Sequence, residues 1–173
     1  MILGLVSFAG GQDSQIPNDT LIWRDNRPLD FQDFLGEPIE SSNLMGEAFC
    51  LILTTFDKPV DSTYVTISVQ AVFDKTNSWI SRRAKVEEML LFQVTFNMFE
   101  VYARKLRKEA LALRSDPFAQ SVFQKKYALS LPSLTYKCNE LKRDTRMGSN
   151  KERLLIWDAK VKSELKDLEQ YKQ

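Results

Sequence analysis

Apolar and polar residues alternate over residues 64–73, and this pattern predicts a half-buried β-strand. Its apolar members are Val65, Ile67, Val69, Ala71 and Phe73. A second apolar run, residues 49–53, offers this strand a partner, and residues 57–61 have the composition of a connecting loop. We therefore expect an antiparallel strand pair.

A long helical pattern extends between residues 84 and 114, a stretch without glycine or proline. Its apolar residues recur at steps of three and four and predict one amphipathic helix buried along the stripe Met89, Phe92, Phe96, Phe99, Ala103, Leu106, Ala110 and Leu113. Glu100 precedes Arg104 by four residues, and Lys105 precedes Glu109 in the same way. We expect this charged run to be a solvated face rather than a phosphate-binding patch.

Further helices are predicted after residue 114. Asp116 and Pro117 offer an N-cap and a first residue for the second helix, and Pro132 is expected to divide the helical region after residue 117. Ser149 and Glu152 form a capping box for the last helix, whose buried stripe is Leu154, Trp157, Val161, Leu165 and Leu168. The chain therefore reads as α+β, with a small antiparallel sheet packed on a long helix and further C-terminal helices.

The first 19 residues differ from the rest of the chain. An apolar run gives way to small and then polar residues, as at the end of a truncated secretory signal, which implies a periplasmic or secreted protein. The other interpretation is an apolar N-terminal strand. Residues 20–173 are expected to form a single domain, in which residues 30–34, before Gly36 and Pro38, are a turn or short helical piece.

The composition is that of an ordinary soluble globular domain. The chain has 173 residues, of which 43% are hydrophobic and 27% charged, and its formal net charge is +1. The near-neutral balance gives no broad electrostatic reason to expect a nucleic-acid partner, and no membrane span is expected in the mature chain.

Histidine is absent, and this limits the chemistry. Most zinc-hydrolase, Ser-His and Cys-His mechanisms are excluded, because each depends on an imidazole. Cys50 and Cys138 could form a disulfide in an oxidising compartment or remain as two buried thiols, and the sequence favours the thiols. Cys138 as a nucleophile would need activation by a lysine or a helix N-terminus.

Two pairs of carboxylates could suggest glycosidase-like chemistry. Asp30 lies three residues before Asp33, and Glu87 is next to Glu88. Such chemistry needs a cleft and a defined separation between the carboxylates. We expect all four side chains to be solvated surface charges.

Several segments resemble a bacterial family catalogued as domain of unknown function 922, whose members are regarded as secreted zinc-dependent proteases. The family has the helical pattern L-L-H-E-x-x-H-F followed by Tyr-Ala-Arg-Lys-Leu-Arg-Lys, an N-terminal L-x-W-x-D-F-x-G and a C-terminal E-T-x-H-G. The similarity covers residues 23–171, and its best matches here are residues 29–36, Ser78 with Trp79, residues 90–96, residues 100–108 and residues 144–148.

The resemblance implies a zincin-like topology. It places the metal ligands and the general base on residues that cannot bind zinc or accept a proton. The two histidines fall on Phe92 and Phe96, the general base on Gln93, and the third ligand on Met147. Phenyl rings bind no zinc, an amide is no effective base, and a thioether is a poor zinc ligand. We therefore expect no metal cofactor and no metal-dependent catalysis.

The leading hypothesis is a non-catalytic, peptidase-like envelope or secreted protein that binds a protein or peptide through the relic of the groove. The alternatives are a hydrolase, such as a peptidase, with a metal-independent site, and a purely structural domain. Phe92 and Phe96 are expected to be core residues, while the rival interpretation puts them and Met147 at the bottom of an open groove. An open, polar groove would favour binding or catalysis, and a closed, dry one a structural role.

Overall fold

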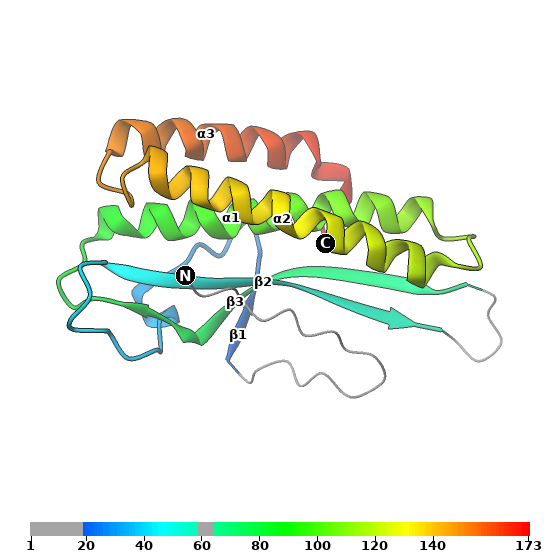
Figure 1. Cartoon of the computed structure of the whole chain (residues 1–173), viewed down its shortest axis with the longest axis horizontal. Coiled ribbons are helices and arrows are strands. Elements are labelled where there is room, and N and C mark those ends of the chain that lie inside the picture. Colours follow the sequence, from blue (N-terminus) through cyan, green and yellow to red (C-terminus); the bar gives the residue numbers. More distant parts are fainter. Residues whose placement is uncertain (1–18, 59–63) are drawn as a thin grey trace.

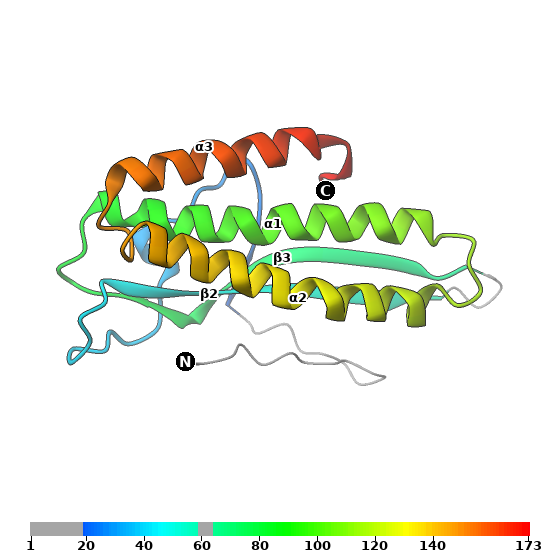
Figure 2. The same ribbon diagram turned by 45° about the horizontal axis from the view of Figure 1, so that its top comes forward.

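The computed structural model describes residues 19–58 and 64–173 and confirms the α+β class. Three long helices lie on one face of a three-stranded antiparallel sheet (Figures 1 and 2). The strands are β1 (Thr20–Ile22), β2 (Gly46–Asp57) and β3 (Thr66–Ile80), in the order β1-β3-β2. The helices are α1 (Met89–Ala112), α2 (Ala119–Asp144) and α3 (Lys151–Asp167), with 3-10 turns η1 (Phe31–Asp33), η2 (Val86–Glu88) and η3 (Glu169–Tyr171).

The predicted strand pair is confirmed, and both strands are longer than their patterns indicate. Cys50 pairs with Phe73 and Ile52 with Ala71, in the antiparallel register of β2 and β3. The register shifts between Glu47 and Phe49, because β3 has extra residues between Asp74 and Trp79 at this point. The proposed leader and most of the proposed connection lie outside the described residues.

Helix α1 is the centre of the fold. Strands β3 and β2 cover one side, α3 covers the opposite side, and α2 packs along the flank (Figures 1 and 2). The long-helix prediction is confirmed, but the expected solvated face is wrong at Glu100 and Arg104, which are 1% and 0% exposed. They are buried because α3 and η3 pass over this part of α1, so that Arg104 Nη1 donates to the Leu165 carbonyl at 2.6 Å.

Helix α2 does not divide at Pro132, contrary to the sequence expectation. Pro132 and Ala128 are both exposed, so the Ala128 carbonyl, which loses its N–H partner to the proline ring, can be hydrated. The helix also begins later than expected, with Phe118 as its N-cap. Asp116 stabilises the preceding turn, where its Oδ1 accepts a hydrogen bond from the Phe118 N–H at 2.7 Å.

The capping residue of α3 differs from the predicted one by a single position. Asn150 is the N-cap, and its Oδ1 accepts from the Arg153 N–H at 3.2 Å. The predicted box of Ser149 and Glu152 is therefore wrong, although the buried stripe from Leu154 to Leu165 is confirmed. Asn and Ser are both favourable caps, and the sequence alone does not separate neighbouring candidates.

The expectation of solvated carboxylates fails at Asp33. This side chain is fully buried and accepts two hydrogen bonds from Arg27, at 2.7 and 2.9 Å. It also accepts from the Asp30 N–H at 2.8 Å and so caps η1, the short helical piece predicted for this segment. Asp30 and Glu87 are exposed, and Glu88 is partly exposed. Asp33 therefore stabilises a loop and is not one member of an open pair.

Cys50 and Cys138 are both free in the structure, as the sequence favoured. Burial raises the pKa of Cys138 to about 11, and it also raises the pKa of Cys50 well above its ordinary value. Both groups are therefore thiols at neutral pH, and Cys138 is poorly suited to act as a nucleophile. No helix in the described part of the chain is both long and apolar enough to span a bilayer.

Candidate functional site

The two positions expected to carry metal-binding histidines lie in the core. Phe92 is 5% exposed, and its ring centroid is 5.2 Å from that of Phe34. Phe96 is fully buried, with its ring 5.8 Å from that of Phe73 on β3. The ring edge of Phe92 also lies over the backbone of Gly46, where an added Cβ would approach it to 2.8 Å. The expectation of core packing is therefore confirmed for both phenylalanines.

Gln93 forms a polar link between α1 and the N-terminal segment. Its Oε1 accepts from the Leu29 N–H at 2.7 Å, and its Nε2 donates to Asn97 Oδ1 at 2.9 Å. Asn97 Oδ1 also accepts from Trp23 Nε1 at 2.8 Å. Both ends of the amide are thus used in structural hydrogen bonds, and a carboxylate here would lose the donor that reaches Asn97.

Met147 belongs to a tight turn between α2 and α3. Arg146, Met147 and Gly148 have φ values of 49°, 58° and 87°, so three successive residues are left-handed. A Cβ built on Gly148 would lie 3.3 Å from a methyl group of Leu91, which places the turn over that residue. Met147 itself is 44% exposed.

The four expected relic positions therefore do not gather at one point. Phe92 and Phe96 pack toward the sheet, whereas the turn of Met147 meets α1 at Leu91, which is about 100° away from Phe92 around the helix. Leu91 and Thr95, four residues apart, share that second face. The residues at the expected positions do not fit a zinc ion, because they offer two phenyl rings, a committed amide and a distant thioether.

Other residues that carry the resemblance have structural roles. A Cβ on Gly36 would come within 2.8 Å of the Ser78 carbonyl, so only glycine fits there. Ser78 Oγ accepts from the Phe49 N–H at 2.9 Å and holds the irregular part of β3 against β2. Buried Thr145 donates to the Leu141 carbonyl at 2.7 Å and accepts from the Gly148 N–H, which ends α2. These residues stabilise the scaffold.

Glu100, Arg104 and Arg107 form a buried ion cluster that the sequence patterns did not reveal. Glu100 Oε1 accepts from Arg104 Nε at 2.9 Å and from Arg107 Nη1 at 2.8 Å. Arg107 also donates to the Val69 carbonyl on β3 and the Tyr171 carbonyl near the C-terminus. The cluster therefore joins the sheet, α1 and the C-terminal turn. The one trace of this cluster in the sequence is the i,i+4 spacing of Glu100 and Arg104. The same spacing is common on solvent-exposed helix faces.

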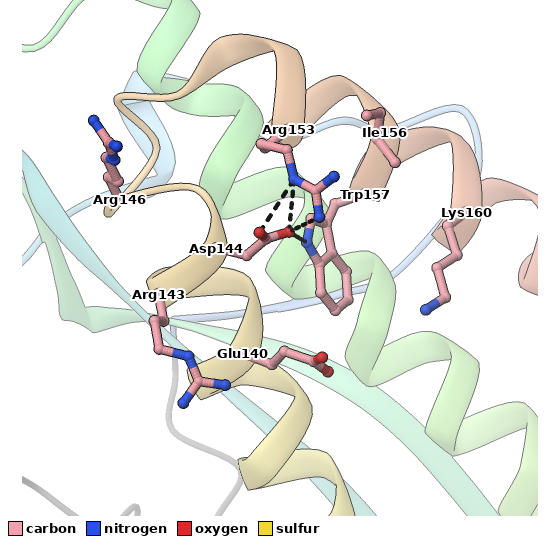
Figure 3. Close-up of a pocket in the computed structure, with 8 residues that line it drawn as sticks. All are labelled: Glu140, Arg143, Asp144, Arg146, Arg153, Ile156, Trp157 and Lys160. Carbon is pink, nitrogen blue, oxygen red and sulfur yellow. Dashed lines mark hydrogen bonds and ion pairs between the residues drawn. The ribbon is translucent and has the colours of Figure 1, made fainter.

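The corner between α2 and α3 contains an open pocket of about 460 Å³ (Figure 3). We call it the corner pocket. It adjoins the turn of Met147, and it is lined by Glu140, Arg143, Asp144, Arg146, Arg153, Ile156, Trp157 and Lys160. Four cationic side chains and two carboxylates thus line the pocket. No sequence pattern marks this pocket, because its residues come from two helices and a turn.

One wall of the corner pocket is fixed by a hydrogen-bond network. Asp144 Oδ2 accepts from Arg153 Nη2 at 2.7 Å and from Trp157 Nε1 at 2.8 Å (Figure 3). These hydrogen bonds, with that of Arg153 the strongest influence, lower the pKa of Asp144 below its ordinary value. Lys160 Nζ lies 5.1 Å from the centroid of the Trp157 ring, within cation–π distance. Asp144 is therefore ionised at neutral pH and holds the side chains of Arg153 and Trp157 in place.

Within residues 19–58 and 64–173, no group of three or more histidine, cysteine, aspartate or glutamate side chains is arranged to hold a metal ion. Comparisons of the chain with protein-family models, with curated proteins and with solved structures give no match.

Proposed function

We propose that this protein is a non-catalytic, peptidase-like domain that acts by binding another molecule. The observation that carries the proposal is the packing of Phe92 and Phe96 against the sheet, where the resemblance implies metal ligands. The face to which the resemblance assigns a metal and a substrate is here part of the apolar core. The signal-like N-terminal sequence supports a location outside the cytoplasm.

The free energy of burial favours phenylalanine over histidine at these two positions when no metal is bound. Burial of one phenylalanine side chain contributes about 1.5–3 kcal/mol, whereas two buried imidazoles without a metal would need other hydrogen-bond partners. Loss of metal ligands can therefore be accompanied by a gain in stability at these two positions. Gln93 supports the same interpretation, because its amide donates to Asn97 where a glutamate could not.

The corner pocket supports binding at a different place from the expected groove. Phe92 and Phe96 are buried and cannot line an open groove, so the hypothesis of binding through that surface is replaced by binding at the α2–α3 corner. The pocket is open, polar and beside the turn that the resemblance assigns to the third ligand. The filled face alone would also suit a purely structural domain, and the corner pocket is the feature that favours binding.

The test is to incubate the purified full chain with a mixed peptide library, with added zinc in one arm and a chelator in the other, and to follow the peptides by mass spectrometry. We expect the same intact peptides in both arms, with zinc content at the level of the dialysis buffer. Cleavage that co-purifies with the folded protein in either arm would refute the non-catalytic assignment, and its loss in the chelator would show that the activity depends on a metal.

A further inference from the structure

We propose that the corner pocket binds an acidic peptide segment, with its carboxylates paired to Arg143, Arg146 and Lys160. The inference rests on the proposed function and adds the chemistry of the partner. It is carried by the charge, the rigidity and the apolar border of the pocket.

The cationic side chains of the pocket divide into two groups. Arg153 is neutralised by Asp144, with which it makes hydrogen bonds of 2.7 and 3.1 Å. Arg143, Arg146 and Lys160 make no ion pair with a carboxylate in the part of the chain that the structure describes. Three positive charges are therefore available to a ligand in one hollow, and Arg143 and Arg146 can each bind a carboxylate through two N–H groups.

The pocket is held in shape before any ligand binds. Asp144 bonds Arg153 and the Trp157 indole, which fixes the junction between α2 and α3. Arg146 lies in a turn whose backbone is held by Thr145 and Gly148. A preformed wall loses less conformational entropy on binding, and the exposed side chains of Arg143, Arg146 and Lys160 supply positive charge around it.

The border of the pocket suits a polypeptide ligand. Ile156 lines the pocket and is half-exposed, and Tyr136, one turn before Glu140 on α2, is 63% exposed. Exposed tyrosine and isoleucine beside arginine and tryptophan give the composition of protein-binding hot spots. Apolar side chains of a peptide can therefore cover this border while its carboxylates enter the pocket.

The charge pattern disfavours a nucleic acid as the ligand. Glu140 and Asp144 lie among the cations, and the chain as a whole carries a formal net charge of only +1. Binding of a polyanion depends on a continuous basic surface that neutralises many phosphates. A peptide can use Glu140 as well, because its backbone N–H groups and any lysine can donate to that carboxylate.

The experiment uses the full chain and a short fluorescent peptide rich in aspartate and glutamate, with fluorescence anisotropy as the readout. We expect saturable binding that weakens at high salt, and the double variant Arg143→Glu, Lys160→Glu should bind about tenfold or more weakly. The matched control is Lys125→Glu, Lys166→Glu, which makes the same charge change at exposed positions of α2 and α3. It should change affinity by less than about twofold.

The indole N–H signal of Trp157 gives a local readout by NMR. Peptide should shift this signal more than those of Trp23 and Trp79, because Trp157 is the tryptophan that lines the corner pocket. Equal weakening by the two double variants, no saturable binding, or tighter binding of a single-stranded oligonucleotide would overturn the acidic-peptide assignment. Mass spectrometry of the same samples separates the two proposals: an intact peptide that ignores the corner variants refutes only this inference, while a cleaved peptide refutes the non-catalytic function.

Discussion

Glu100 and Arg104 form an ion pair in the interior of the protein, with Arg104 Nε 2.9 Å from Glu100 Oε1. Neither side chain reaches solvent, and Arg107 donates to the same carboxylate from the next turn of α1. The Arg104 guanidinium also lies 5.2 Å from the centroid of the Trp23 ring. One buried carboxylate therefore neutralises two guanidinium groups at the joint between the sheet, α1 and α3.

We predict that Glu100→Gln destabilises the protein by about 3–5 kcal/mol, because Arg107 loses its carboxylate partner and Arg104 keeps only the exposed carboxylates of Glu169 and Asp25. The measurement is urea unfolding followed by circular dichroism. Glu109→Gln is the control, since Glu109 pairs with Lys126 on an exposed surface and should cost less than about 1 kcal/mol. Similar losses in the two variants would contradict the role assigned to the buried pair.

The sequence was sufficient for the main elements of the fold because their patterns are long. The alternation over residues 64–73 and the stripe of α1 both extend over several repeats, and the structure confirms both. The sequence could not reveal which charged residues are buried, since Glu100 and Arg104 have the spacing of a surface pair. Only the packing of α3 across α1 decides the matter. Local propensity also misplaced the effect of Pro132, because an exposed carbonyl tolerates the missing donor.

The candidate site was harder to predict from the sequence than the fold. Core packing of Phe92 and Phe96 followed from the apolar stripe, and the structure agrees. The position of Met147 relative to them depended on the path of the chain between α2 and α3, which no local pattern specifies. The corner pocket likewise combines Arg143 with Lys160 across two helices. Such a cluster exists only once the helices are packed.

We predict that Phe96→Ala lowers the free energy of unfolding by about 3–5 kcal/mol, because it removes a fully buried ring that packs on Phe73. Denaturant unfolding measures the loss. Phe118→Ala deletes the same atoms from a residue that is 70% exposed and should cost less than about 1 kcal/mol. If Phe96→Ala costs as little as the control, position 96 belongs to an open groove and the proposed function loses its main support.

The stability of the protein should fall in acid partly through Asp33. Burial raises the pKa of this carboxyl, but hydrogen bonds from Arg27 and the Asp30 N–H, with the nearby charge of Lys75, outweigh burial and lower it below 3.8. A lowered folded-state pKa contributes stability at pH values above 3.8, and this contribution disappears as the pH falls through the folded-state value.

Asp33→Asn should therefore be less stable than the wild type at neutral pH, and the difference should shrink below about pH 4. Urea unfolding across an acidic pH series measures the difference. Asp167→Asn, at an exposed position near the end of α3, should follow the wild type at every pH. A constant difference between Asp33→Asn and the wild type would mean that the ionisation of Asp33 does not contribute.

The structure also predicts which face of α1 could be converted into a metal site. Two histidines four residues apart on one helix face can bind one zinc ion together with a third histidine that reaches the same point. The turn between α2 and α3 meets α1 at Leu91, where Gly148 lies in contact with the leucine side chain. Thr95 is one turn further along the same face, and its hydroxyl donates to the Leu91 carbonyl at 2.8 Å, so this hydrogen bond joins no two elements.

We therefore expect the triple variant Leu91→His, Thr95→His, Met147→His to bind zinc, and the triple variant Phe92→His, Phe96→His, Met147→His to bind it weakly or to unfold. In the first set the two helical histidines face the turn, whereas in the second they replace rings that pack against the sheet. Isothermal titration of zinc compares the sets, and each is also measured with alanine in place of histidine at position 147.

Histidine at position 147 should tighten binding only beside positions 91 and 95. Tightening beside positions 92 and 96 instead would show that the turn reaches the sheet-facing side of α1, and the resemblance-based assignment of all four relic positions would then stand. Zinc binding by the first set needs no peptidase activity, because a general base and a substrate cleft are separate requirements that the three histidines do not supply.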